Sequence, residues 1–368
     1  MPTHMKALVL HGPNDLRLEQ VPKPEAGPGS VVVQVLSAPL WDYLKEVVDG
    51  KRQYPLAFPL VFGTCCVGRV TEVGPDVKAL QPGSLVFCDY IVHLRDAPEE
   101  RIVLGYHGGQ TALEQKLSSE YWKDGCFAEF ARFPAENVHE LDEAALDRNG
   151  IPPHQMSELA SIIPGMGAAN AIGVKPGETV LVLPATGFFS SSAIVAALAQ
   201  GAAVVAGSRS RDKLDALVEH FGDDGRRINP VVLTGDVHQD CAALRAATPG
   251  GRGADAYIDY SPPMAAGTTH IEAGLLALKR HGRCCFAGVI VDKVPIPYAA
   301  VMAQCLTIKG QFAQSRDDVA QAIRLIEAGN MKLRKEVIAR HPLEEYEEAL
   351  TLAAASGGWK SLVLLTPN

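Results

Sequence analysis

The sequence predicts an α/β protein with two domains, one a barrel-like domain of antiparallel strands and the other a doubly wound parallel sheet. The chain has 368 residues, which is beyond the size at which a single hydrophobic core is usual. Short β-branched runs broken by Gly and Pro fill roughly the first 150 residues. From about residue 155, strand-like runs alternate with helix-like runs, as in a parallel sheet.

The N-terminal strands are separated by turn residues. We expect strands over residues 30–36, 68–73, 84–87 and 127–131, with turns such as Gly-Pro-Asp at 74–76 and Gln-Pro-Gly at 81–83. Runs of this length between such turns are typical of an antiparallel, barrel-like arrangement.

In the second part, the alternation predicts helices on both faces of a sheet. Expected strands cover residues 178–183, 202–206, 231–233, 256–259 and 283–287, and expected helices cover 190–200 and 211–221. The last 60 or so residues predict helices over 317–329 and 343–355, then a closing strand over 361–365.

The composition excludes several classes of protein. Acidic residues outnumber basic ones, 42 against 34, whereas a nucleic-acid binder needs a basic face. No run approaches the roughly 18 apolar residues of a membrane span, and the first residues lack the core of a signal peptide. We therefore expect a cytoplasmic protein that acts on a small-molecule substrate, with no nucleic-acid or membrane partner. Its eight scattered cysteines should be reduced thiols, and the adjacent pairs should be small buried residues.

Residues 180–193 resemble a dinucleotide-binding turn, with a strand, a Gly-containing loop and a helix whose first N–H groups can face a pyrophosphate. The usual glycine pattern is altered, because Pro184 occupies the first glycine position and a serine occupies the last. Two phenylalanines would crowd the phosphates only if they point inward. The alternative is a turn that keeps only the fold. The predicted cofactor contacts here are Thr186, Gly187, Phe188, Phe189 and Ser190.

The end of the next strand indicates which dinucleotide binds. An acidic residue there holds the ribose hydroxyls of NADH, whereas basic groups accommodate the 2′-phosphate of NADPH. Residues 206–213 read AGSRSRDK, with no acid at the strand end, and Ser208, Arg209 and Lys213 can donate to a phosphate. We therefore expect NADPH as the cofactor. The alternative is that the basic residues only decorate an exposed helix start.

Over nearly its full length the sequence resembles the medium-chain dehydrogenase/reductase superfamily. The matching segments occur in the family's order, at residues 5–10, 61–63, 68–77, 81–86, 125–130, 174–182, 282–288 and 306–310. The resemblance implies a GroES-like domain over residues 1–158, a Rossmann domain over 159–309, and a segment, 310–368, that returns to the first domain. It also implies a homodimer.

The positions of the family's catalytic zinc ligands are altered. They correspond to Leu40, to Thr64 with Cys65, and to Pro164, and two of these side chains cannot bind a metal. The four closely spaced cysteines of the family's structural zinc lobe are also absent, because the 88–126 segment holds only Cys88 and Cys126. We expect no metal.

Without zinc, the chain resembles the branch that contains quinone reductases and enoyl or double-bond reductases. We expect an NADPH-dependent reductase that transfers hydride to an activated C=C bond of an enone or enoyl substrate, in a biosynthetic pathway. The turn GKRQYP at residues 50–55 resembles the tyrosine-bearing turn of enoyl thioester reductases. Tyr54 and Tyr43 are therefore candidate proton donors, with packing as the alternative role. Asp42 is expected to cap the helix that begins there.

Two further regions complete the expected site. By resemblance, Gly288, Val289, Gly310 and Phe312 lie on the segments around the nicotinamide, although packing alone would also explain the glycines. The 88–124 segment is longer than a minimal connection and is expected to form a pocket wall or an oligomer contact. It carries His93, Tyr106, His107, Tyr121 and Trp122.

Other functions remain open at this level. A ketone or quinone reductase would use the same hydride geometry. The altered turn at Pro184 and Ser190 could also abolish dinucleotide binding, leaving a redox-neutral enzyme such as a cyclase, or a binding protein.

Overall fold

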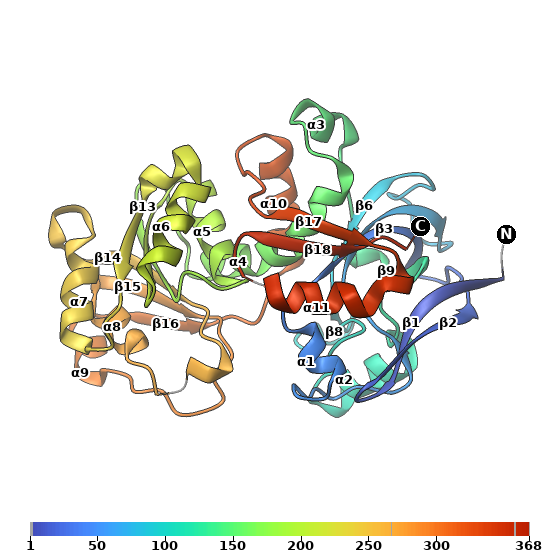
Figure 1. Cartoon of the computed structure of the whole chain (residues 1–368), viewed down its shortest axis with the longest axis horizontal. Coiled ribbons are helices and arrows are strands. Elements are labelled where there is room, and N and C mark those ends of the chain that lie inside the picture. The colour runs from blue at the N-terminus through green and yellow to red at the C-terminus, as the bar shows by residue number, and fades with distance from the viewer. Residues whose placement is uncertain (1–2, 266, 357, 368) are drawn as a thin grey trace. The chain divides into compact units, whose positions relative to one another are not determined.

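The computed structural model describes residues 3–265, 267–356 and 358–367, and the chain forms two compact units (Figure 1). Unit 1 contains residues 3–160, 335–356 and 361–367, and unit 2 contains residues 161–334 and 358–360. No helix in the described ranges is long and apolar enough to cross a membrane.

Unit 1 is built around one long central strand, β3 (Ser30–Leu40), which is buried along almost its whole length. β3 is buried because it pairs antiparallel with three strands, β5 (Cys66–Val73), β9 (Phe130–Pro134) and β18 (Ser361–Leu365). A strand covered on both sides reads as a continuous apolar run, which explains the sequence SVVVQVL at its start. The other strands of this sheet are β6 (Leu85–Cys88), β10 (Val138–Glu140) and β17 (Glu336–His341).

Smaller elements surround this sheet. A second sheet contains β1 (His4–Gly12), β2 (Asp15–Pro22) and β4 (Leu60–Val61), and a two-stranded ribbon contains β7 (Ile91–His93) and β8 (Arg101–Val103). The helices are α1 (Leu44–Val48), α2 (Ala112–Lys116), α3 (Glu143–Arg148) and α11 (Tyr346–Ser356). The mainly antiparallel pairing confirms the expected class of this part of the chain.

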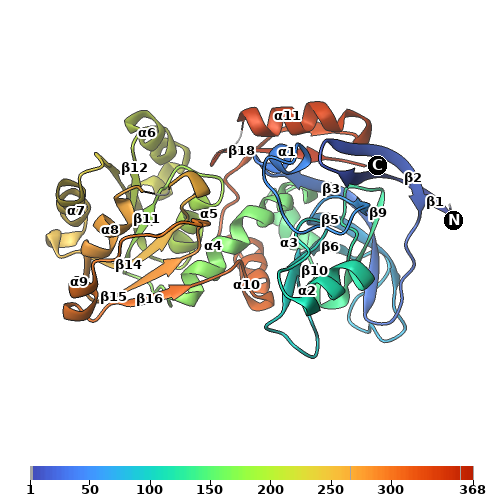
Figure 2. The same ribbon diagram turned by 90° about the horizontal axis from the view of Figure 1, so that it is seen from below.

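The C-terminal strands complete the unit that the N-terminal residues begin. Figures 1 and 2 show the red β18 beside the blue β3, and the two pair antiparallel from Val363 with Leu40 to Leu365 with Ala38. All five residues of β18 are buried. The chain therefore leaves unit 1, forms unit 2 and returns.

Unit 2 has a six-stranded sheet in which every pairing is parallel. The spatial order is β13-β12-β11-β14-β15-β16, so the chain starts in the middle, moves to one edge and then crosses to the other side. This is the order of a Rossmann fold, whose switch point lies between the two central strands, here β11 and β14. The strands are β11 (Thr179–Leu183), β12 (Ala203–Ser208), β13 (Ile228–Val232), β14 (Ala254–Asp259), β15 (Leu278–Phe286) and β16 (Thr307–Gly310).

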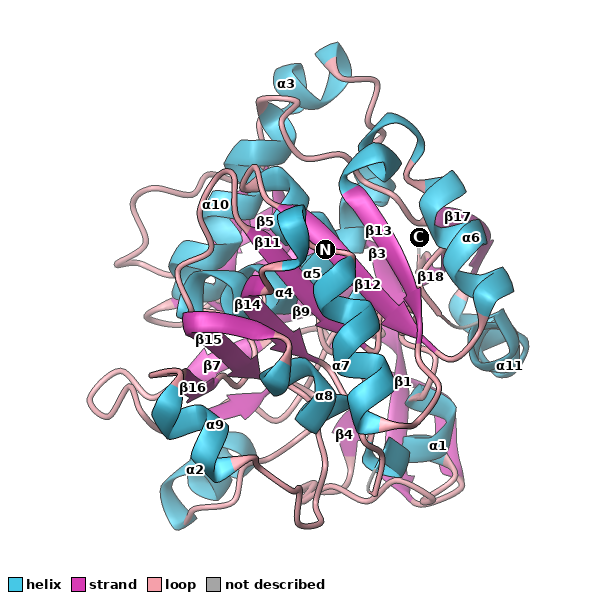
Figure 3. Cartoon of the chain, turned by 90° about the vertical axis from the view of Figure 1, so that its left-hand side faces the viewer, coloured by secondary structure: helices cyan, strands magenta, loops and turns pink. Residues whose placement is uncertain are grey.

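Helices flank this parallel sheet, as Figure 3 shows with helices in cyan and strands in magenta. Polar caps set several of their starts. Ser210 accepts the N–H of Lys213 at the start of α6, and Ser315 forms a capping box with Asp318 at the start of α10. The helices are α4 (Leu159–Ala171), α5 (Ser190–Ala199), α6 (Arg211–His220), α7 (Val237–Ala246), α8 (His270–Leu276), α9 (Tyr298–Ala303) and α10 (Arg316–Glu327).

Two local predictions are wrong. The expected strand at 127–131 begins only at Phe130, because the Phe127 backbone instead bonds to Phe62 and Leu8, which lie on other segments. Asp42 does not cap α1. Tyr43 occupies the cap position, without a side-chain cap bond.

Candidate functional site

The turn after β11 lies at the switch point of the unit 2 sheet, where ligands bind in folds of this kind. The N–H of Ala185 donates to Gly207 at 2.8 Å, and the hydroxyls of Thr186 and Ser208 lie 3.1 Å apart. These contacts join the turn to the end of β12. They bring together residues that the sequence assigned separately to the pyrophosphate and to the 2′-phosphate.

The start of α5 directly follows this turn, where a helix N-terminus would meet an anion. Its cap residue, Phe189, makes no side-chain cap bond, and the N–H groups of Ser191 and Ser192 donate to the carbonyls of Gly187 and Phe189 at 3.2 and 3.1 Å. Phe188 is only 6% exposed and its ring lies 5.0 Å from that of Phe189, so the two rings pack against each other. Ser190 is buried at the first helical position. The altered turn thus keeps the strand-turn-helix arrangement, with two phenylalanines and a buried serine at its end.

The groups at the end of β12 fit an additional phosphate. Ser208 is buried with its hydroxyl against Thr186, whereas the side chains of Arg209 and Lys213 are exposed at the start of α6. Neither basic side chain makes an ion pair within the described residues. Both are therefore available to an anion.

On the other side of the switch point, the segments that follow β15 and β16 carry the remaining predicted cofactor contacts. A Cβ on Gly288 would lie 2.5 Å from the backbone nitrogen and oxygen of Ser261, so only glycine allows this close approach. Val289 and Phe312 are 58% and 52% exposed, unusually high for apolar side chains, and a Cβ on Gly310 would meet nothing. These residues offer uncovered apolar surface at the carboxyl ends of β15 and β16.

Unit 1 brings the two candidate tyrosines together with a third. The rings of Tyr54 and Tyr106 lie 4.8 Å apart, and those of Tyr43 and Tyr106 lie 6.4 Å apart. The guanidinium of Arg52 stands 4.1 Å above the ring of Tyr43, and the ring of His107 lies 5.2 Å from that of Tyr54. We call Tyr43, Tyr54 and Tyr106 the phenol cluster.

The environment raises the pKa of two members of the phenol cluster, Tyr43 and Tyr106. Burial raises the pKa of Tyr43 far above its ordinary value, and the nearby Tyr54 raises it further. Burial likewise raises the pKa of Tyr106, helped by Tyr43 and Tyr54. Burial also lowers the pKa of His107, whose Nδ1 accepts the N–H of Gly109 at 3.0 Å. The cluster can therefore donate hydrogen bonds to an oxygen that gains negative charge.

A buried lysine near Asp42 escaped the sequence analysis. Lys335, 4% exposed, lies just before β17, and burial lowers its pKa to about 8, although Glu158 and Asp42 oppose this shift. Burial raises the pKa of Asp42, which Lys335 and Arg52 lower in part. Nothing in the polar sequence around Lys335 indicates that its side chain is buried. The burial arises because the chain returns to unit 1 at this point.

The positions that correspond to zinc ligands do not fit a zinc ion. Leu40 and Thr64 are 2% and 1% exposed, and the Thr64 hydroxyl donates to Cys65 Sγ at 3.5 Å. Pro164 lies inside α4, and its carbonyl oxygen accepts the hydroxyl of Tyr260. A catalytic zinc takes about three nitrogen, sulfur or carboxylate ligands, and Leu40 and Pro164 offer no side-chain donor.

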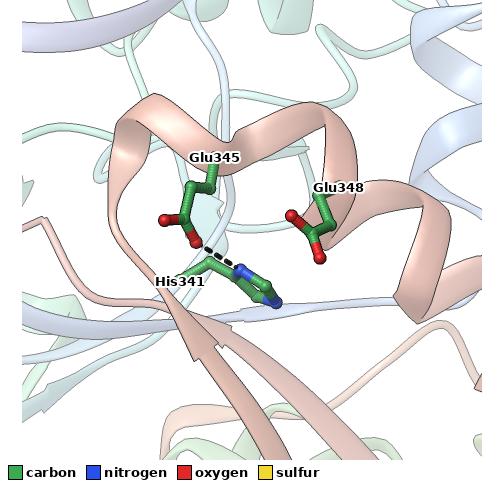
Figure 4. Close-up of side chains that lie close together, drawn as sticks. All are labelled: His341, Glu345 and Glu348. Carbon is green, nitrogen blue, oxygen red and sulfur yellow. Dashed lines mark hydrogen bonds and ion pairs between the residues drawn. The ribbon is translucent and has the colours of Figure 1, made fainter.

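Among the described residues, one group of three side chains could offer ligands to a metal ion: His341, Glu345 and Glu348 (Figure 4). Nδ1 of His341 lies 2.8 Å from a carboxylate oxygen of Glu345, whose side chain is 51% exposed. The group lies at the end of β17 and the start of α11, on unit 1, and does not include Leu40, Thr64 or Cys65. It therefore does not restore the family's zinc site.

The adjacent cysteines are small buried residues, as predicted. Cys65, Cys66, Cys284 and Cys285 are each 0% exposed, and all eight cysteines of the chain are free.

Comparison with known proteins agrees with the fold. Residues 27–143 match the alcohol dehydrogenase GroES-like domain, and residues 190–328 match the zinc-binding dehydrogenase domain. Together with the Rossmann strand order, these matches define a two-domain oxidoreductase. The chain is a member of the medium-chain dehydrogenase/reductase superfamily.

Relatives within the superfamily differ in their reactions. An acryloyl-coenzyme A reductase from Sulfurisphaera tokodaii is 27% identical over 246 residues, covering 63% of this chain and 70% of the relative. An alcohol dehydrogenase from Geobacillus stearothermophilus is 24% identical over 94% of both chains. A solved structure of a putative zinc-binding dehydrogenase from Sinorhizobium meliloti, bound to NADP, superposes with a TM-score of 0.79 at 22% identity over 100% of both chains.

Proposed function

We propose that the protein is an NADPH-dependent, zinc-independent reductase that transfers hydride to the activated C=C bond of an enone or enoyl substrate. The phenol cluster beside Arg52 carries the proposal, because its hydroxyl groups can donate hydrogen bonds to a substrate oxygen without a metal ion. Similarity to an acryloyl-coenzyme A reductase supports the same reaction class.

Residues of unit 2 would hold the cofactor. The N–H groups at the start of α5, with Thr186, Gly187, Phe188, Phe189 and Ser190, would bind the pyrophosphate. Ser208, Arg209 and Lys213 would bind the 2′-phosphate. Gly288, Val289, Gly310 and Phe312 would lie along the nicotinamide half. When bound, NADPH supplies the hydride.

The phenol cluster would stabilise the charge that the hydride brings. Addition of hydride to the β-carbon of an enone places negative charge on the carbonyl oxygen, and a phenol hydroxyl can donate to that oxygen. We assign this donation, and delivery of the proton, to Tyr54, with Tyr43 as its partner. The raised pKa of Tyr43 keeps its proton available across the neutral range.

A carbonyl or quinone reductase is the second candidate. Similarity to an alcohol dehydrogenase over 94% of both chains favours it, and the same phenols could donate to a carbonyl oxygen that receives the hydride directly. We further propose that the protein acts as a cytoplasmic homodimer in a biosynthetic pathway, with functional domains over 1–158 and 159–309 and a returning segment over 310–368.

Cofactor and substrate assays test the proposal. NADPH and NADH are titrated separately into the purified protein by calorimetry, and oxidation of NADPH is then followed with an enone, an enoyl thioester and a saturated ketone. We expect tighter binding of NADPH, and activity with the first two substrates that survives exhaustive treatment with a chelator. Binding of neither cofactor, or activity that disappears with the chelator and returns with zinc, would contradict it.

A further inference from the structure

A buried polar cluster lies at the carboxyl end of β14, outside the residues assigned so far. Asp259 ends that strand, Ser261 follows it and His270 begins α8, and their exposed fractions are 3%, 1% and 8%. Because β14 pairs with β11 at the switch point, the cluster lies at the same edge of the sheet as the turn after β11.

The contacts of Thr268 favour a proton on Nδ1 of His270. The hydroxyl of Thr268 donates to the carbonyl oxygen of Ala265 at 2.6 Å, and this oxygen can only accept. The single hydroxyl hydrogen of Thr268 is therefore used there. Since Nδ1 of His270 lies 2.8 Å from the same hydroxyl oxygen, Nδ1 must donate.

The other ring nitrogen carries a proton when Asp259 is ionised. Ser261 Oγ donates to Oδ1 of Asp259 at 2.5 Å, so the contact of 2.7 Å between Ser261 Oγ and Nε2 of His270 needs Nε2 as the donor. Nε2 also lies 3.5 Å from Oδ1 of Asp259. His270 is then an imidazolium paired with a carboxylate through a bridging serine.

A second arrangement has the same number of protons. In it, the proton of Nε2 lies on the Asp259 carboxyl group instead, so that both Asp259 and His270 are neutral. Two further donors favour the imidazolium, because they stabilise a charged carboxylate at Asp259. The Tyr257 hydroxyl lies 3.3 Å from Oδ1, and the N–H of Ser261 lies 3.4 Å from Oδ2.

The arrangement is not that of a hydrolase. In a Ser-His-Asp triad the imidazole lies between the serine and the carboxylate, whereas here Ser261 lies between Asp259 and His270. The Ser261 hydroxyl donates to the carboxylate and is buried, so it is not poised as a nucleophile.

The cluster instead joins two loops. The N–H of Ala287 donates to the carbonyl of Asp259 at 3.0 Å, and the N–H of Val289 donates to that of Ser261 at 2.8 Å. Gly288 lies between them, where a Cβ would also meet Oδ2 of Asp259 at 2.9 Å. The loop after β15 is thus held against residues that the His270 network orients.

We propose that His270 is a positioning residue of the dinucleotide site: a buried imidazolium, held by Asp259 and Ser261, that orders the loops after β14 and β15. Loss of its proton breaks the bond from Nε2 to Ser261 and weakens dinucleotide binding. This inference rests on the proposed function, which places the cofactor along these loops. Titratable and charged groups on the elements around the cluster include Tyr257 and Tyr260 at the end of β14, His238, Asp240, Cys241 and Arg245 on α7, Glu272 on α8, and Cys284 and Cys285 on β15.

Nitrogen NMR of the imidazole rings, on the protein without nucleotide, tests the protonation state. We expect both ring nitrogens of His270 to show the shifts of a protonated imidazole at pH 7, with His270→Gln or His270→Asn assigning the signal. A ring with one unprotonated nitrogen at pH 7 would overturn the proposal. The measurement on the wild type does not depend on cofactor binding.

The positioning role is tested by NADPH calorimetry between pH 6 and 9. We expect Ser261→Ala, which keeps both charged partners, and His270→Gln to raise the NADPH Kd about tenfold at pH 7. The wild-type affinity should weaken as the pH rises, and both variants should flatten this pH dependence. His238→Gln is the matched control, since His238 is exposed on α7, and should keep the wild-type affinity and pH profile.

These experiments distinguish a failure of the positioning role from a failure of the proposed function. A wild-type affinity and pH profile in folded Ser261→Ala and His270→Gln would overturn the positioning role and leave the proposed function intact. Absence of NADPH binding by the wild type would overturn the proposed function, and the positioning role with it. If a variant does not fold, the other variant and the wild-type NMR measurement still decide.

Discussion

The dinucleotide turn of unit 2 and the phenol cluster of unit 1 are assembled in opposite ways. The turn comes from consecutive residues, 183–190, and is bonded to Gly207 and Ser208 of the next strand. The phenol cluster joins residues 43 and 54 to residue 106, and the buried Lys335 near Asp42 comes from the far end of the chain. A site made from one strand-turn-helix segment can be predicted from the sequence, whereas a site assembled from distant loops cannot.

If unit 2 binds the cofactor and the phenol cluster stabilises the transition state, as we propose, substitutions should separate kcat from cofactor affinity. The largest effect is expected for Tyr54→Phe. Removal of one hydrogen-bond donor from the developing charge should lower kcat about 100-fold and leave the NADPH Kd unchanged. Steady-state kinetics and calorimetry measure the two quantities. Tyr121→Phe, at an exposed tyrosine, is the control, and an equal effect of both substitutions would contradict the assignment.

Gly288→Ala tests whether the edge of the unit 2 sheet is closely packed. The added Cβ would lie 2.5 Å from the Ser261 backbone, so we expect the free energy of unfolding to fall by about 2 kcal/mol. Gly310→Ala is the matched control, because its Cβ would meet nothing within 4 Å. Denaturant unfolding compares the two variants, and equal midpoints would show that the edge can relax.

Arg209→Ala tests the cofactor preference. We expect the Kd for NADPH to rise about tenfold and the Kd for NADH to stay unchanged, because only NADPH carries the 2′-phosphate. Arg211→Ala removes an arginine of similar exposure, paired with Asp215 at 3.7 Å, and should change neither value. A parallel loss of both cofactors in Arg209→Ala would show a general effect on the turn.

The smallest effect concerns Lys335 and the stability of unit 1. Burial lowers the pKa of Lys335 to about 8, so between pH 8 and the ordinary lysine pKa the unfolded chain binds more protons than the folded chain. The free energy of unfolding should therefore rise with pH there, by about 1 kcal/mol from pH 8 to 9. Urea unfolding should show this rise in the wild type and in the exposed-site control Lys332→Met, but not in Lys335→Met. A rise that persists in Lys335→Met would assign it to other groups.

The sequence predicted the fold class and most elements, because strand and helix patterns are local. The closing strand at 361–365 and the turn after β11 are clear examples. Asp42 was assigned a local role as a cap, but its neighbours are the long-range partners Lys335 and Arg52. His270 carries no signal in the sequence either, since its protonation follows from hydroxyl directions at Thr268 and Ser261 that only the folded chain defines.

The most direct test of the central claim is the position of deuterium after reduction of a cyclic enone with NADPH deuterated at the transferable position. The enone offers both an activated C=C bond and a carbonyl, so one product reports the reaction type. We expect deuterium on the β-carbon when the protein has been treated exhaustively with a chelator. Deuterium on the carbonyl carbon, or no transfer unless zinc is added, would contradict it.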